Sequence, residues 1–179
     1  MALARALRVD PRAAGAKLSA STFRNRIRAE PCPVRALWEL VDVLVCNAEE
    51  ARLLTEQASL HGALDAIGAV IRARDHASAM CVTDGAGGEY LMTIAGALLV
   101  ASYPTSVVDP TGADETFAGA LMAAHLAGAG LAQAMVTGTA ASLAVEGIGP
   151  NRLFAATPCE MQRRAAVIAA MTETACRHG

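Results

Sequence analysis

The sequence predicts an α/β protein, a three-layer sandwich in which helices cover a mostly parallel β-sheet. Two short runs, VDVLVC at residues 41–46 and AMCVT at residues 79–83, are almost continuously apolar and rich in β-branched side chains. Such runs are typical of parallel strands that are buried on both faces. Apolar residues recur at helical spacing between and after them. Strands separated by helices predict βαβ units, and therefore a parallel sheet with helices on both faces.

Helices and strands are expected to alternate along most of the chain. Strands are predicted at residues 16–21, 41–46, 79–83, 89–93 and 97–101. Helices are predicted at residues 2–14, 34–40, 48–54, 61–73, 131–145 and 159–176, with one more after the turn at 109–115. Ala95 and Gly96 would close a hairpin between the last two strands, because small residues and glycine suit a tight turn.

Two stretches before the VDVLVC strand are expected to be loops. Arg24, Arg26 and Arg28 alternate along the chain, which favours a solvated surface segment without regular structure. Pro31 and Pro33 follow them, and proline is poorly tolerated inside a helix because it lacks a backbone N–H. The next helix is therefore expected to begin only at residue 34.

Length and charge limit the classes of function. A chain of 179 residues fits one domain of ordinary size, in which we assign residues 1–14 to an N-terminal helical extension and residues 15–179 to the main fold. The net charge is −2, and aromatic residues make up 3% of the chain. Nucleic-acid binding is not expected, because it needs a basic surface and usually aromatic stacking platforms.

The sequence predicts a cytoplasmic protein that does not enter a membrane. The five cysteines include no CxxC pair, so free thiols in a reducing compartment are expected rather than a zinc site or a disulfide framework. Residues 117–136 are apolar over the length of a membrane span. His125 and Gln133 interrupt this segment, and Gly128 and Gly130 mark a break between two helices. Two buried helices are therefore expected there.

Three loops carry the residues that could perform chemistry. They are NAEE at residues 47–50, TDGAGG at 83–88 and DPTGADE at 109–115. Each loop follows a predicted strand or precedes a predicted helix, which is where ligands bind in open α/β sheets. Each also has a purely structural interpretation. Asn47 and Glu50 have the spacing of a helix capping box, the glycines suit a tight turn, and Asp114 and Glu115 would compensate a helix dipole.

The three loops in this order resemble those of the PfkB (ribokinase-like) family of sugar and nucleoside kinases. The signature of that family, D-[PT]-T-G-A-G-D-[ST]-F followed by A-G-[GA], is matched over most of its length. The matching residues are Asp109, Thr111, Gly112, Ala113, Thr116, Phe117, Ala118, Gly119 and Ala120. The N-x-x-E motif is matched at Asn47 and Glu50, and the glycine loop is matched at Thr83, Gly85 and Gly88.

The resemblance implies an ATP-dependent phosphotransferase that uses Mg²⁺ and a small sugar or nucleoside substrate. It assigns Gly112 and Ala113 to a backbone anion hole, a role suited to the start of a helix. Glu115, or else Asp114, would be the general base that takes the proton of the attacking hydroxyl. Residues implied to border the nucleotide are Thr83, Gly85, Gly88 and Thr111. Those implied to organise Mg²⁺ are Asn47 and Glu50.

The catalytic turn departs from the family pattern at two neighbouring positions. Asp114 stands where the family has glycine, and Glu115 stands where it has the catalytic aspartate. A carboxylate in place of the glycine would bring like charge toward the phosphates, and the longer Glu115 would displace the base. An alternative is therefore a non-catalytic kinase fragment that binds a nucleotide or a protein partner.

The resemblance runs from Gly15 to the end of the chain and corresponds to the C-terminal half of a family member. The half that carries the substrate-binding residues and the lid has no counterpart in these 179 residues. A sheet divided in this way would expose a strand edge and an apolar face. A homodimer, or association with the missing N-terminal half, is therefore expected.

Overall fold

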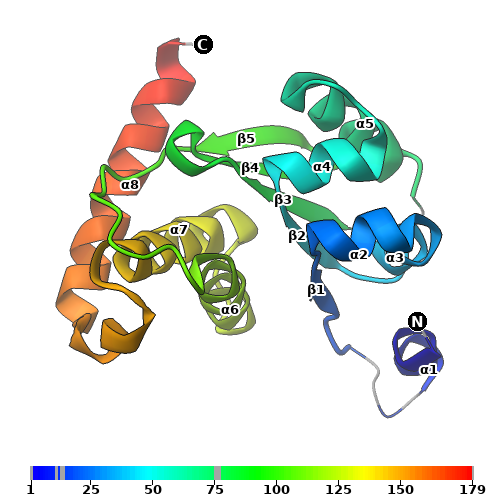
Figure 1. Cartoon of the computed structure of the whole chain (residues 1–179), viewed down its shortest axis with the longest axis horizontal. Helices are drawn as coiled ribbons and strands as arrows, with labels where there is room; N and C mark the ends of the chain where they lie inside the picture. Colours follow the sequence, from blue (N-terminus) through cyan, green and yellow to red (C-terminus); the bar gives the residue numbers. More distant parts are fainter. Residues whose placement is uncertain (1, 11, 13–14, 75–77, 179) are drawn as a thin grey trace. The chain divides into compact units, whose positions relative to one another are not determined.

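The computed structural model describes residues 2–10, 12, 15–74 and 78–178 and has five strands in one sheet (Figure 1). The strand order in the sheet is β1-β2-β3-β4-β5. The strands are β1 (Ser19–Ser21), β2 (Val43–Asn47), β3 (Ala79–Thr83), β4 (Glu89–Thr93) and β5 (Gly96–Val100). The α-helices are α1 (Ala2–Val9), α2 (Arg24–Ala29), α3 (Pro31–Trp38), α4 (Ala48–Thr55), α5 (Leu60–Arg72), α6 (Ala113–Leu126), α7 (Leu131–Ile148) and α8 (Pro158–His178).

The sheet is mixed, with its parallel part at the beginning of the chain. β1 pairs with β2 in parallel, with Ser19 opposite Val43. β4 and β5 are neighbours joined by a two-residue turn at residues 94–95, a connection that only antiparallel strands can make. β3 and β4 are also neighbours, joined by only five residues, so β3, β4 and β5 run antiparallel to one another in turn. The α/β class expected from the sequence is therefore confirmed, and the later part of the sheet is antiparallel.

The chain divides into two compact units, which are described separately. The first unit comprises residues 1–82 and 92–97, and the second comprises residues 83–91 and 98–179. In the first unit α4 packs against α5 and α2. The interior of this unit consists of apolar side chains such as Leu44 and Ile67, both fully buried.

The arginine segment of the first unit is a helix, so the prediction of a loop at this place was wrong. The N–H groups of Arg26 and Ile27 donate to the carbonyl of Phe23, which begins α2. Arg26 forms an ion pair at 2.8 Å with Glu30, which lies four residues later and therefore one helical turn further on. Arg24 and Arg28 both reach Glu49 of α4, each at 3.3 Å. Ile27 between them is 2% exposed and α2 packs against α4, so burial stabilises this helix and the exposed ion pairs add little.

The boundaries of three other early elements also differ from the prediction. α3 begins at Pro31 rather than at residue 34, since a proline in the first turn loses no helical hydrogen bond. β1 covers only Ser19–Ser21 instead of residues 16–21. α1 ends at Val9, whereas the helix was predicted to continue to residue 14; residues 11, 13 and 14 lie outside the described residues.

The second unit is built on three long helices. α7 packs against both α6 and α8, and α6 and α7 lie side by side (Figure 1). Gly138 of α7 permits this close packing, because a Cβ atom at this position would lie 3.0 Å from the carbonyl oxygen and ring of Phe117. Phe117 is 1% exposed and is among the largest fully buried side chains.

Substitution of Gly138 should show how far this helix contact stabilises the second unit. We expect Gly138→Ala to lower the free energy of unfolding by about 1 to 3 kcal/mol, because the added methyl group overpacks against Phe117. Gly119→Ala on α6 is the matched control: its Cβ meets nothing within 4 Å. Alanine there should raise stability by about 0.5 to 1 kcal/mol. Equal effects of both substitutions in urea unfolding would contradict this packing.

The structure bears on the expectations about membranes and thiols. Among the described residues, no helix is both long enough and apolar enough to cross a membrane. Among the described residues, Cys32, Cys46, Cys81 and Cys159 form no disulfide, and Cys81 is fully buried. Burial raises the pKa of Cys81 to about 12, so this thiol stays protonated. The expected self-association stays a prediction.

Candidate active site

The turn that precedes α6 has the backbone geometry of an anion-binding loop. Gly112 is the residue before the helix and has φ of +83°, a left-handed conformation that glycine adopts without strain. The Asp109 carboxylate accepts the N–H of Thr111 at 2.9 Å, and the Pro110 carbonyl accepts the N–H of Ala113 at 3.1 Å. These two bonds fix the shape of the turn.

The first turn of α6 leaves backbone donors available. Thr116 is the first residue of the helix whose N–H reaches back to Gly112, at 2.9 Å. The N–H groups of Asp114 and Glu115 precede it and have no carbonyl of the helix within reach, as in any first helical turn. The Ala113 N–H, assigned from the sequence to an anion hole, is engaged by Pro110. No side chain caps this helix, so capping does not explain the two acids.

Asp114 links the turn to the glycine loop of the second unit. Burial raises the pKa of Asp114, the neighbouring Glu115 raises it further, and a hydrogen bond with Thr83 opposes the shift. Thr83 is the last residue of β3 and the first of the TDGAGG segment. Two of the three loops singled out in the sequence therefore lie near each other in the second unit.

The glycines of the TDGAGG segment have different roles. Gly85 has φ of +52°, and a side chain at this residue would meet open space. Gly88 has φ of +91°, and a Cβ there would lie 2.5 Å from the carbonyl oxygen of Val100. Gly88 is thus required for the close approach to β5, which is a structural role. Gly85 is the glycine with space beside it for a ligand.

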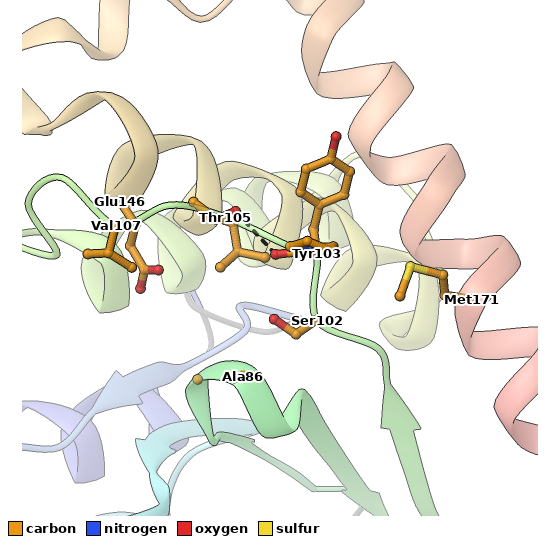
Figure 2. A pocket seen from close by; sticks show the side chains of 10 residues that line it. Ala86, Ser102, Tyr103, Thr105, Val107, Glu146 and Met171 are labelled. Carbon is orange, nitrogen blue, oxygen red and sulfur yellow. Dashed lines mark hydrogen bonds between the residues drawn. The ribbon is translucent and has the colours of Figure 1, made fainter.

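A cavity of about 660 Å³ lies beside Gly85 in the second unit (Figure 2). Its walls come from the glycine loop, the irregular segment after β5, and helices α7 and α8. The lining residues are Gly85, Ala86, Ser102, Tyr103, Pro104, Thr105, Val107, Leu143, Glu146 and Met171. Thr83, Gly88 and Thr111, which the sequence also assigned to the nucleotide, are not among these lining residues.

One side of the cavity is apolar and the other is acidic. Tyr103 and Met171 form an apolar wall, and Figure 2 shows the Glu146 carboxyl on the opposite side, beside Val107. Burial raises the pKa of Glu146, and the charge of Asp114 raises it further. The acidic side of the cavity is therefore near enough to Asp114 for the two carboxylates to repel each other.

Glu89 is a buried acid behind this site. It begins β4, its side chain is 3% exposed, and its Oε2 has no hydrogen-bond partner. Burial raises the pKa of Glu89 to about 8, the nearby Thr139 hydroxyl opposes the shift, and Glu146 adds to it. The Glu89 carboxyl is therefore largely neutral at pH 7.

Asn47 and Glu50 belong to the first unit and form a complete capping box. The Asn47 side chain accepts the N–H of Glu50 at 3.0 Å, and the Glu50 carboxylate accepts the N–H of Asn47 at 3.2 Å. Thr22 donates to the same carboxylate oxygen of Glu50 at 2.8 Å. The structural interpretation of this motif is thus confirmed, and its role toward a metal stays a prediction.

The fit of these residues to Mg²⁺ depends on water. Mg²⁺ prefers oxygen ligands and usually keeps several waters of its own. Glu50 is 6% exposed, and its Oε2 already accepts two hydrogen bonds. Among the described residues, no group of three His, Cys, Asp or Glu side chains could hold a metal ion. The residues therefore fit a cation held through its water shell rather than by a set of direct protein ligands.

Comparison with known proteins identifies the family. A model of the "pfkB family carbohydrate kinase" matches residues 13–155. The chain belongs to the PfkB family. No match was found among curated proteins.

Solved structures of ribokinase-like kinases share the fold of this PfkB-family chain. A PfkB protein from Polaromonas sp. JS666 is 26% identical, with a TM-score of 0.61 over 87% of this chain and 51% of that one. Adenosine kinase from Sinorhizobium meliloti is 22% identical, with a TM-score of 0.70 over 82% and 44%. Aminoimidazole riboside kinase from Salmonella enterica, complexed with its riboside and an ATP analog, is 20% identical, with a TM-score of 0.71 over 91% and 55%. The PfkB-family chain thus spans about half the length of these structures.

Several residues of the site were not singled out from the sequence of this PfkB-family chain. Glu89 carried a detectable signal, because strand alternation places it on the same face of β4 as the buried Leu91. Glu146 lies in the last turn of α7, which was predicted to end at residue 145. Tyr103 lies in an irregular segment, where no periodicity indicates which side chains face inward.

Proposed function

We propose that this chain takes part in ATP-dependent phosphoryl transfer to a hydroxyl group of a sugar or nucleoside. In this proposal the cavity of the second unit holds the base and ribose of ATP, and the turn before α6 receives the terminal phosphate. The observation that supports it is the proximity of Asp114 to Thr83, close enough for the Thr83 hydroxyl to lower the pKa of Asp114, which puts the turn before α6 near the glycine loop. The cavity beside Gly85 supplies space for the nucleotide.

The residues have separate roles in this reaction. Glu115, or less directly Asp114, takes the proton of the substrate hydroxyl while its oxygen attacks the γ-phosphorus and ADP leaves. The N–H groups of Gly112, Asp114 and Glu115 point along the start of α6 and stabilise charge on the transferred group. Asn47 and Glu50 would hold Mg²⁺ through water. Bound Mg²⁺ supplies positive charge that neutralises the phosphates.

The catalytic turn also favours a second candidate function, nucleotide binding without turnover. Asp114 replaces a glycine of the family turn and places a carboxylate beside Glu115, where phosphate charge would develop. The loss of one well-placed donor in such a site lowers the rate by about 100- to 1000-fold. A chain with this turn could retain the nucleotide site and lose most of its activity.

Calorimetry followed by a turnover assay distinguishes the two functions. We expect Mg-ATP and Mg-ADP to bind the purified chain with dissociation constants in the range of about 10 μM to 1 mM, and ADP release to depend on a sugar or nucleoside acceptor. The acceptor is identified with a panel of sugars and nucleosides in a coupled ADP assay. Binding without acceptor-dependent release would support the second function. Absence of binding would contradict both.

A further inference from the structure

The described residues that line the cavity carry a carboxyl group and no basic side chain. They include no lysine or arginine, and Glu146 is the one with a carboxyl group. The nearby guanidinium groups of Arg163 and Arg164 contact the opposite wall at Tyr103. A nucleoside triphosphate carries several negative charges, which most proteins meet with Lys, Arg, Mg²⁺ or a helix N-terminus. The carboxyl of Glu146 therefore opposes the binding of phosphate groups at this end of the cavity.

The backbone holds Glu146 in place. Its carbonyl oxygen accepts the N–H of Val108 at 2.8 Å and the N–H of Asp109 at 3.2 Å. These bonds connect the last turn of α7 to the segment that leads into the catalytic turn. Because both partners are backbone groups, replacement of the Glu146 side chain leaves them intact.

The charged groups that face Glu146 are acids. The charges of Asp114 on α6 and of the buried Glu89 on β4 both interact with it, and Glu115 neighbours Asp114. α8 contributes Arg163 and Arg164, but both pair with Glu160, at 2.9 and 2.8 Å. The short helix at Pro150–Ala155 contributes Arg152, which takes part in none of the ion pairs of the described residues. Among the described residues, Glu146 takes part in no ion pair, and only burial and an acid shift its pKa.

We propose that Glu146 is a specificity-determining residue that makes the cavity discriminate against negative charge on its ligand. The inference rests on the proposed function, which places the phosphates at the turn before α6. Compared with a protein that lacks this carboxylate, the chain should bind a neutral nucleoside about equally well. It should bind Mg-ADP more weakly, and Mg-ATP more weakly still. The discrimination should also weaken at low pH, because burial and Asp114 raise the pKa of Glu146 and favour its neutral form.

The test compares Glu146→Gln with the unaltered chain for three ligands. Glutamine keeps the size of the side chain and removes its charge. We expect the affinity for adenosine to change less than twofold, and the affinity for Mg-ATP to increase by about tenfold at pH 8, with Mg-ADP between them. At pH 6 the increase for Mg-ATP should be smaller. At a given pH the ligand has the same protonation state with both proteins. The ratio of the two affinities at that pH therefore reports the effect of the Glu146 charge alone.

Asp65→Asn is the matched control, since Asp65 is an exposed carboxylate on α5 of the first unit. It should leave all three affinities unchanged, and thermal melting should show that both variants are folded. An equal gain for all three ligands, or no gain for Mg-ATP, would overturn the role of Glu146 while nucleotide binding remained. Failure of every ligand to bind either folded protein would overturn the proposed function, and this inference with it.

Discussion

Replacement of Asp114 by glycine together with Glu115→Asp should raise the rate of phosphoryl transfer by about 100- to 1000-fold. The double substitution restores the glycine and aspartate of the family turn. Glycine removes the Asp114 carboxylate, which is held beside Glu115, from the place where phosphate charge develops. Aspartate shortens the side chain of the base by one methylene group. A catalytic group misplaced by about 1 Å lowers the rate about 100-fold.

The rate is measured as acceptor-dependent ADP release by the purified variants. Asp114→Asn with Glu115→Asp is the matched control, because it removes the charge but keeps a side chain at residue 114. If close backbone approach matters, the glycine variant should exceed the asparagine variant; if only charge matters, the two should be equal. A rate that stays at the level of the unaltered chain in both would show that this turn does not limit activity.

Glu89→Gln should stabilise the protein, and by more at high pH than at low pH. The folded-state pKa of Glu89 is about 8, against an ordinary value of 4.5. The folded protein therefore binds more protons than the unfolded chain between these values, and the free energy of unfolding falls as the pH rises from 4.5 to about 8. Each pH unit between these values lowers the free energy of unfolding by about 1.4 kcal/mol. Glu89→Gln should therefore raise the free energy of unfolding by about 3 kcal/mol at pH 7 and by little at pH 4.5.

Urea unfolding at several pH values measures this effect. Glu160→Gln serves as a control of opposite sign, because hydrogen bonds from Arg163 and Arg164 lower the pKa of Glu160 to about 2. Its contribution to stability is present above the ordinary pKa and is lost as the pH falls toward 2. The Glu89 variant should flatten the loss of stability between pH 5 and 8, and the Glu160 variant should leave it unchanged. An unaltered slope in the Glu89 variant would contradict its burial.

Most elements could be predicted because their periodicity is strong. β3 was predicted at the residues where it lies, since four consecutive apolar residues followed by a glycine-rich turn leave little alternative. α2 could not be predicted in this way. Its helical form is stabilised by burial of Ile27 and by packing against α4, which comes much later in the chain, and the exposed ion pairs to Glu49 add little. A contact of this kind leaves no periodic signal in the segment itself.

The candidate site was predicted only where it follows from local sequence. The turn at residues 109–115 has a local pattern, and its geometry at Gly112 agrees with that pattern. The wall of the cavity at Tyr103 and Met171 depends on how an irregular segment meets α8, which no short motif encodes. The acidic character of the cavity likewise arises from Glu146, Asp114 and Glu89, which lie on three different elements.

Nuclear magnetic resonance of the ¹⁵N-labelled chain during titration with Mg-ADP and then Mg-ATP tests the central claim most directly. The amide signals of Gly85 and Tyr103 should shift with both nucleotides, because both residues line the cavity. The amide signals of Asp114 and Glu115 should shift further with Mg-ATP, because the terminal phosphate would lie at the start of α6. Shifts confined to other residues, or unchanged signals at the start of α6 when the cavity is occupied, would contradict the assignment of this turn to phosphate binding.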